Sequence, residues 1–461
     1  MRGSHGWAEV ARERKREIIG AIVATTPTSG PSHIELDLTD RCNVACYFCN
    51  QQDLRTREQL PLQRTTDLID ELAATGLKSV RMSGGGDPLF HREVGEVLDH
   101  LAARGVVVDN LTTNGVALTP EIARCLIENR AREIIFSLDA VDAADYARML
   151  QVKPALFDRV LANIRMLVAE RGPSIHPSIV VQFLLDRRNF TRMVEMYDLA
   201  GSLGADRIAF NLVQEIPRQR IDRESLLTKK DAALAEPHFE EVLRRDRERG
   251  LLQIDFSVEG WNEMAARVRM RTGGHPSNSY PTAPSFRDAN GGCFFAWYTA
   301  AITGNGDIRP CCLLLSPDVP PLGNIHDRSL SEQWRGEVFQ TMRCEMREVL
   351  LRKGKVSYSR KSFKVLEPAC VRDAACWLKN MYFRGDEEFY AELGAALDEA
   401  RRKELRWFGS AAQFRRRTAM LLYDILSKSG AYRLYDRLRN ASRPLRIALK
   451  KRLHVNLTDA A

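Results

Sequence analysis

The chain has 461 residues, enough for two or three domains with sizeable cores, and its content of 44% hydrophobic and 28% charged residues is that of a soluble globular protein. No apolar run is long enough to span a bilayer, and the first residues lack the apolar core of a signal peptide, so we expect a cytoplasmic protein. The net charge of +8 is uneven, because residues 401–461 hold 16 Lys and Arg against 4 Asp and Glu, a net +12, and the other residues sum to −4. In a reducing compartment, the ten cysteines favour metal binding over disulfides.

Strands and helices are expected to alternate along the first half of the chain. Residues 1–32 predict a short helix and a Pro/Ser/Gly-containing link, too few for an independent peptide-binding domain. Short apolar strands are then expected at 33–38, 79–82, 106–111, 133–138, 178–185 and 207–213, with helices at 60–74, 94–103, 120–128, 154–170 and 190–203. Six β/α repeats predict an α/β fold at 33–215, in which a parallel sheet with helices on one face curls into a partial (β/α)6 barrel.

Three cysteines, Cys42, Cys46 and Cys49, lie in one loop directly after the first expected strand. An odd number of thiols cannot pair off as disulfides, whereas a short loop can direct three thiolates toward one metal centre. A [4Fe–4S] cluster needs four ligands, so three cysteines would leave one iron open to a small molecule. The alternatives are a zinc site that lacks one ligand and a chance group of buried cysteines.

Three further loops at the carboxyl ends of the expected strands are rich in glycine and polar residues. They are 83–89 (Ser-Gly-Gly-Gly-Asp-Pro-Leu), 112–115 (Thr-Thr-Asn-Gly) and 137–139 (Ser-Leu-Asp). In a β/α barrel such loops meet at the mouth that carries the active site. Because glycine lets the backbone approach a ligand closely, the four loops together predict a ligand site.

The Cys42-x3-Cys46-x2-Cys49 spacing, with Phe48 before the last cysteine and Gly-Gly-Gly-Asp-Pro after the next strand, resembles the radical S-adenosylmethionine (SAM) enzymes over residues 33 to about 214. The resemblance implies that the three cysteines hold a [4Fe–4S] cluster and that the amino and carboxylate groups of SAM chelate its fourth iron. The reduced cluster would cleave SAM to methionine and a 5′-deoxyadenosyl radical, which abstracts hydrogen from a substrate C–H bond. A reducing partner such as flavodoxin or ferredoxin would supply the electron.

The same resemblance assigns contacts with SAM, although the sequence assigns no catalytic acid, base or hydrogen donor. A glycine-rich loop would receive the methionine amino group, an aromatic residue would lie near the adenine, and two polar residues would contact the ribose or the methionine carboxylate. In that order, these residues are Gly84, Gly85, Gly86 and Asp87, then Phe48, then Asn114 and Ser137. Asp87 stands where many relatives carry Glu. Arg148 is a candidate clamp for the carboxylate, with an exposed helix arginine as the alternative.

A second group of cysteines follows a charged and then Pro/Ser/Asn-rich connector at 216–289. Cys293 and Cys311 flank an expected β-hairpin, which is similar to the start of the SPASM and twitch auxiliary-cluster domains and predicts such a domain at 290–382. The number of cysteines favours one auxiliary [4Fe–4S] cluster, which would relay an electron or serve the structure alone. Its expected ligands are Cys293, Cys311, Cys370 and Cys376, with Cys312 and Cys344 in reserve, while Cys125 is expected to pack in the core.

The C-terminal region, 383–461, alternates apolar and basic residues at helical spacing and predicts two or three amphipathic helices. These helices would pack on the body with a solvated basic face, or they would bind an anionic partner such as a membrane surface or a phosphate-bearing carrier. No nucleic-acid recognition motif accompanies the charge, so nucleic acid is not expected as a specific partner.

The sequence therefore predicts a radical SAM oxidoreductase that acts on a small polar molecule, such as a sugar or an aminocyclitol, in a biosynthetic pathway. That choice of substrate rests on the single auxiliary cluster and on the short N-terminal segment. The first alternative is a maturase that modifies a side chain of a peptide or protein, as ribosomal-peptide and sulfatase maturases do. The second is a non-catalytic iron–sulfur protein.

Overall fold

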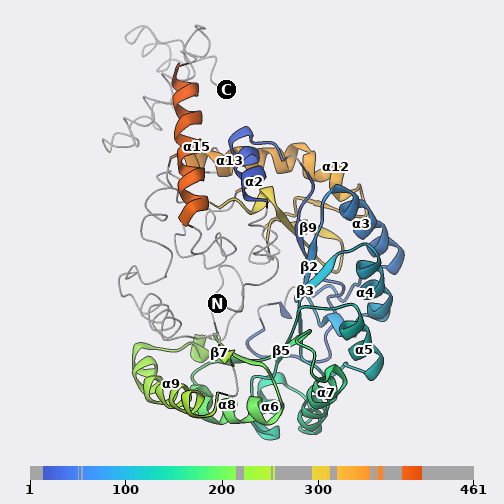
Figure 1. Cartoon of the computed structure of the whole chain (residues 1–461), viewed down its shortest axis with the longest axis vertical. Helices are drawn as coiled ribbons and strands as arrows, with labels where there is room; N and C mark the ends of the chain where they lie inside the picture. The colour runs from blue at the N-terminus through green and yellow to red at the C-terminus, as the bar shows by residue number, and fades with distance from the viewer. Residues whose placement is uncertain are drawn as a thin grey trace, which may run out of the picture. The chain divides into compact units, whose positions relative to one another are not determined.

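The computed structural model describes residues 14–27, 29–49, 51–52, 55–213, 223–250, 253–254, 293–311, 319–352, 359, 362–366 and 387–406 (Figure 1). The chain divides into two compact units, Met1–Ala396 and Leu397–Ala461, and all the strands below belong to the first. No helix within these described ranges is both long enough and apolar enough to cross a membrane.

In the described part of the first unit, ten strands form one sheet in the order β10-β9-β8-β1-β2-β3-β4-β5-β6-β7. Neighbouring strands from β8 through β1 to β7 are parallel, whereas β9 and β10 continue the other edge antiparallel. The strands are β1 (His33–Leu36), β2 (Ser79–Met82), β3 (Val107–Thr113), β4 (Glu133–Ser137), β5 (Ser178–Leu185), β6 (Arg207–Leu212), β7 (Gln253–Ile254), β8 (Thr299–Ile302), β9 (Asp307–Arg309) and β10 (Gly323–Asn324).

Helices connect the parallel strands, and Figure 1 shows α3, α4, α5 and α7 following one another along one side of the sheet. This arrangement confirms the predicted α/β fold with a partial barrel. The helices are α2 (Lys15–Ala24), α3 (Leu62–Thr75), α4 (Val94–Ala103), α5 (Pro120–Glu128), α6 (Ala143–Leu150), α7 (Ala155–Arg171), α8 (Met193–Ser202), α9 (Lys229–Arg249), α12 (Leu330–Arg335), α13 (Glu337–Leu351) and α15 (Glu387–Arg406). No bounds were predicted from the sequence for α6, the helix that follows β4 and carries Arg148.

The two faces of the parallel strands differ in polarity. Apolar residues at alternate positions are buried, and the positions between them include charged and amide side chains, several of them also buried. In the strand register, Glu35 lies opposite Arg81, and Arg81 lies opposite Asn110. The Asn110 amide donates to Glu133 Oε2 at 2.7 Å, and Glu133 forms an ion pair with Arg207. Because the helices cover the apolar face, this polar ladder lies on the inner face of the partial barrel.

The hairpin that opens the expected auxiliary domain extends the core sheet. Its first strand, β8, pairs in parallel with β1 along the whole of both strands. Beside it, the Trp297 indole Nε1 donates to the Ala21 carbonyl of α2 at 3.0 Å. The sequence predicted the hairpin but not this pairing, because two strands that lie far apart in the chain leave no local pattern.

Helix α13 is tied to the start of this hairpin by Arg343, which is completely buried. Its Nε donates to the Ala296 carbonyl at 2.9 Å, and its Nη1 donates to the Trp334 carbonyl at 2.6 Å. The guanidinium carbon lies 4.5 Å from the Trp334 ring centroid and 5.3 Å from that of Phe339. Burial lowers the pKa of Arg343 to about 9. The hydrogen bonds and the two rings offset part of this cost of burial.

Replacing Arg343 with Met, which has a similar length, removes both donors from the buried carbonyls. Because each unpaired buried acceptor costs about 1–3 kcal/mol, we expect the free energy of unfolding to fall by about 3 kcal/mol. Chemical denaturation of the anaerobically purified protein would measure this change. R335M, at an exposed arginine of α12, is the matched control and should lie within about 0.5 kcal/mol of wild type. Equal stability of R343M and R335M would contradict the prediction.

Candidate functional site

The cysteine loop, residues 42–49, begins just after β1 and is held by backbone hydrogen bonds on two sides. On one side, the Gly86 N–H of the glycine loop, residues 83–87, donates to the Thr39 carbonyl at 2.8 Å. On the other side, the Ala45 N–H donates to the Leu150 carbonyl at the end of α6, at 3.0 Å. The cysteine loop therefore lies between the loop that follows β2 and the helix that follows β4.

The three consecutive glycines allow the glycine loop to pack against the segment that leads into the cysteine loop. A Cβ at Gly86 would lie 1.8 Å from the Arg41 carbonyl oxygen. One at Gly85, where φ is +66°, would lie 2.5 Å from Asp40 Oδ1, and one at Gly84 would meet another buried carboxylate oxygen at 2.5 Å. The sequence attributed these glycines to close approach of a ligand, whereas the contact observed is between two loops. Their contact with SAM stays a prediction.

Asp87 joins the glycine loop to the loop that follows β3. The carboxylate is 3% exposed, and burial raises its pKa. Its Oδ1 accepts the Leu89 N–H at 3.0 Å, its Oδ2 accepts the Asn114 N–H at 2.7 Å, and the Thr113 hydroxyl lies 2.9 Å from both oxygens. Both oxygens are thus engaged within the protein. A methionine amino group bound here would share a carboxylate that already holds the two loops together.

The other expected SAM contacts also lie in the loops at this end of the strands. The Asn114 amide Nδ2 donates to Asn43 Oδ1 at 2.7 Å and lies 3.8 Å from Cys42 Sγ, so this side chain contacts the cysteine loop directly. The Phe48 ring packs edge-on against Tyr47, with ring centroids 5.2 Å apart. The structure therefore brings together residues that follow three different strands.

The three thiols of the cysteine loop are partly buried and influence one another electrostatically. Burial raises the pKa of Cys42 and raises that of Cys46 well above its usual range, with added contributions from the neighbouring thiols. In the described part of the chain, no three His, Cys, Asp or Glu side chains converge as ligands of a single metal ion. A [4Fe–4S] cube binds each cysteine at a different iron, so its ligands need not meet at one point.

A buried hydroxyl beside the cysteine loop provides a test of fit for a bound group. Tyr146 of α6 is completely buried, and its Oη has no hydrogen-bond partner among the described residues. Burial raises its pKa, and the nearby Cys46 and Asp139 raise it further, so it stays a neutral donor. A buried donor without an acceptor costs about 1–3 kcal/mol. An acceptor on a group held by the three cysteines would satisfy it, so these residues fit a bound cluster with SAM.

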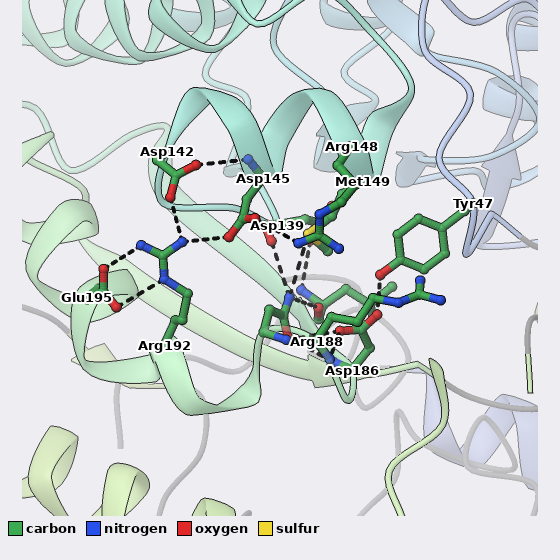
Figure 2. Close-up of polar contacts among 12 residues, drawn as sticks. Tyr47, Asp139, Asp142, Asp145, Arg148, Met149, Asp186, Arg188, Arg192 and Glu195 are labelled. Carbon is green, nitrogen blue, oxygen red and sulfur yellow. Dashed lines mark hydrogen bonds and ion pairs between the residues drawn. The ribbon is translucent and has the colours of Figure 1, made fainter. Parts of the chain in front are cut away.

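Two carboxylates fix the loops that follow β4 and β5, as Figure 2 shows. Asp139 is 1% exposed, and its oxygens accept the Ser137 hydroxyl at 2.9 Å and the Leu184 N–H at 2.7 Å. Burial raises the pKa of Asp139 to about 7. Asp186 Oδ1 accepts the N–H of Arg188 at 2.7 Å, which shapes the turn after β5. Ser137, an expected SAM contact, is therefore already hydrogen-bonded to Asp139.

Tyr47, which lies between Cys46 and Cys49, anchors the cysteine loop to the turn after β5. Its hydroxyl donates to Asp186, and the Arg188 guanidinium carbon lies 4.5 Å from its ring centroid (Figure 2). This role of Tyr47 was not predicted from the sequence. The available signal was a polar Asp-Arg-Arg-Asn run, 186–189, at the carboxyl end of a strand, the same position that drew attention to the other loops.

Arg148 does not point into a closed site. Its side chain is 47% exposed, and its Nη2 donates to Asp145 Oδ1 at 2.7 Å within α6. Nearby, Arg192 pairs with Asp142, Asp145 and Glu195 (Figure 2). Arg148 is thus exposed on α6, and its role as a carboxylate clamp stays a prediction.

The second cysteine group is only partly described. Cys293 and Cys311 are partly buried, flank the β8–β9 hairpin and form no disulfide, while Cys344 is exposed on α13. Cys312, Cys370 and Cys376 lie outside the described residues. The Cys125 thiol lies 3.2 Å from Asp99 Oδ1 and 3.6 Å from the Gly95 carbonyl, between α5 and α4, and is only partly buried.

Known proteins resemble this chain over about two thirds of its length. A PqqA peptide cyclase from Streptomyces rochei is 27% identical over 316 residues, which cover 68% of this chain and 78% of that protein. An AdoMet-dependent heme synthase from Methanosarcina barkeri is 25% identical over 339 residues, which cover 68% of this chain and 86% of that protein.

The fold is similar to that of SuiB from Streptococcus suis, solved with its precursor peptide SuiA, with a TM-score of 0.53 at 17% identity over 73% of this chain and 72% of SuiB. Residues 36–200 match the family model of the radical SAM superfamily, and residues 293–361 match that of SPASM, an iron–sulfur cluster-binding domain. The first match contains Cys42, Cys46 and Cys49, and the second contains Cys293 and Cys311 but ends before Cys370 and Cys376. The chain therefore belongs to the radical SAM superfamily, as an enzyme that uses SAM and a [4Fe–4S] cluster in its core and carries a SPASM iron–sulfur domain after it.

Proposed function

We propose that this enzyme modifies a side chain of a peptide or protein. The proposal rests on the similarity to a PqqA peptide cyclase over 316 residues, which is much longer than the region, 36–200, that matches the radical SAM core alone. This similarity favours the peptide alternative that the sequence left open over a sugar or aminocyclitol, which neither relative supports. The heme synthase matches an equal share of the chain, so an experiment must distinguish a peptide substrate from a non-peptide one.

In this proposal, Cys42, Cys46 and Cys49 hold the cluster. When bound, the cluster and SAM supply the one-electron cleavage and the radical that removes hydrogen from the substrate. The chain's own residues position these groups. The glycines let the glycine loop pack against the segment that leads into the cysteine loop, and Asp87 ties it to the loop after β3. The Tyr146 hydroxyl offers a buried hydrogen-bond donor. The packed loops around the cysteines limit access of water.

The auxiliary cluster is assigned to Cys293, Cys311, Cys370 and Cys376, and it would relay an electron from the substrate radical. A flavodoxin or ferredoxin would reduce the core cluster. The basic region, 383–461, would bind an anionic surface or a phosphate-bearing carrier.

Label transfer distinguishes the substrate classes. Reduced holoenzyme with SAM is expected to form 5′-deoxyadenosine and to move deuterium into it from a labelled peptide, because the radical takes hydrogen from the substrate. Mass spectrometry would follow the nucleoside and the peptide. The candidate substrates to compare are peptides encoded near the gene, sugars and porphyrins. C46A should reduce product to background, while C125A, outside the cysteine loop, should stay close to wild type. Transfer from a sugar or porphyrin, and from no peptide, would contradict the proposal.

Y47F tests whether the anchor to Asp186 retains the core cluster. A hydrogen bond to a charged group contributes about 1.5–3 kcal/mol, so we expect a chelator to remove iron from the core cluster at least about tenfold faster. Y197F is the matched control, since it removes a Tyr–Asp bond of 2.9 Å to Asp246 between α8 and α9. Iron loss at the same rate in both variants would argue against the anchor.

Iron content tests the auxiliary ligands. Wild type is expected to contain about eight irons per chain, and C293A or C311A about four, because two cubes hold four irons each. C344A, at an exposed thiol of α13, should keep about eight. A wild-type content of about twelve irons would show that a second auxiliary cluster is present. A content of about four irons would show that the chain holds no auxiliary cluster.

A further inference from the structure

One guanidinium touches the cysteine loop and the glycine loop together. Arg55 Nη2 lies 3.4 Å from Cys49 Sγ, its Nη1 donates to the Val44 carbonyl at 3.2 Å, and its Nε donates to the Gly85 carbonyl at 3.2 Å. Its side chain is partly buried. A planar guanidinium can direct several donors to partners fixed at different angles, which a lysine cannot do. Arg55 therefore places a permanent positive charge against a thiol that the proposed function makes a cluster ligand.

Two other arginines of the same segment differ from Arg55 in their contacts. Arg41 Nε donates to the Arg57 carbonyl at 2.8 Å, and the side chain of Arg57 is exposed.

We propose that Arg55 raises the reduction potential of the core cluster by stabilising its reduced form through the Cys49 sulfur. The inference rests on the proposed role of Cys42, Cys46 and Cys49 as ligands, but not on the identity of the substrate. When the oxidised cluster accepts one electron from a low-potential reductant, its negative charge grows by one. A positive donor beside a ligand sulfur interacts more favourably with that form, and hydrogen bonds to cluster sulfurs are known to tune the potential. Arg55 is a positioning residue, because it acts through Cys49 and touches no substrate.

The direct test is a redox titration of the reconstituted enzyme with Ti(III) citrate. Electron paramagnetic resonance follows the signal that changes when SAM is added, which separates the core cluster from the auxiliary one. R55Q removes the charge but keeps an amide donor, and R55K keeps the charge. We expect R55Q to lower the equilibrium constant for reduction about tenfold, equal to about 59 mV for one electron. R55K should lie closer to wild type than R55Q does.

R57Q is the matched control, because it removes the same charge from an exposed side chain two positions away, and it should titrate like wild type. A wild-type potential in R55Q, an equal fall in R55K and R55Q, or an equal fall in R57Q and R55Q would overturn the proposal. R55M replaces R55Q in the same comparison if R55Q does not retain its iron. A wild-type enzyme without any SAM-sensitive signal would instead overturn the ligand assignment, whereas failure to find a peptide substrate leaves this titration unaffected.

Discussion

Carboxylates that accept backbone N–H groups from a neighbouring loop hold the mouth of this barrel together. Asp37, just after β1, accepts from the N–H of Gly84 in the glycine loop. Asp87 in turn accepts from the loop after β3 at 2.7 Å, and Asp139, after β4, accepts from the end of β5 at 2.7 Å. All three side chains are buried, so these hydrogen bonds also satisfy polar atoms that would be costly to leave unpaired. These hydrogen bonds fix the loops of neighbouring parallel strands relative to one another.

The cysteine loop depends on this framework because little of its own structure is regular. It contains no helix or strand, and its backbone is held by the glycine loop on one side and by α6 on the other. Tyr47 adds a side-chain anchor to Asp186, and Arg55 adds a link to the Gly85 carbonyl. Thiols that must bind separate corners of one cluster cannot be placed by a flexible loop at low entropic cost. The neighbouring loops hold the three cysteines in position, which the short segments between the cysteines could not do alone.

Local patterns account for the parts of the fold and site that could be predicted from the sequence. Short apolar strands alternate with helices that end at glycines in the left-handed region, such as Gly76 at φ +113° and Gly204 at φ +73°, and these features gave the correct class and order. The cysteine spacing identified the chemistry. The pairing of β8 with β1 and the contact of Tyr47 with Asp186 could not be predicted, since each joins residues that lie more than a hundred positions apart. The substrate class was also beyond the sequence pattern, because a count of cysteines carries no information about the shape of a substrate.

Several residues that the sequence predicts as SAM contacts make contacts within the protein, and a local pattern cannot distinguish these two roles. A run of glycines followed by an acid is compatible with ligand contact and with loop packing, and the sequence cannot separate the two. The structure shows that a side chain at Gly86 would collide with the Arg41 backbone and that Asp87 is fully hydrogen-bonded. These residues fix the positions of the loops, and their contact with SAM stays a prediction.

Charge is the second constraint on this site. Burial raises the pKa of Asp37 to about 8 and that of Asp139 to about 7, which means that the mouth disfavours additional negative charge. A cluster in such surroundings is hard to reduce and, once reduced, donates its electron readily, as the cleavage of SAM requires. The same surroundings would also lower the reduction potential of the cluster, so that a reducing partner could reduce it only with difficulty. In the proposed arrangement, the guanidinium of Arg55 stabilises negative charge at the Cys49 sulfur, so burial of the site and this guanidinium act in opposite directions on the reduction potential.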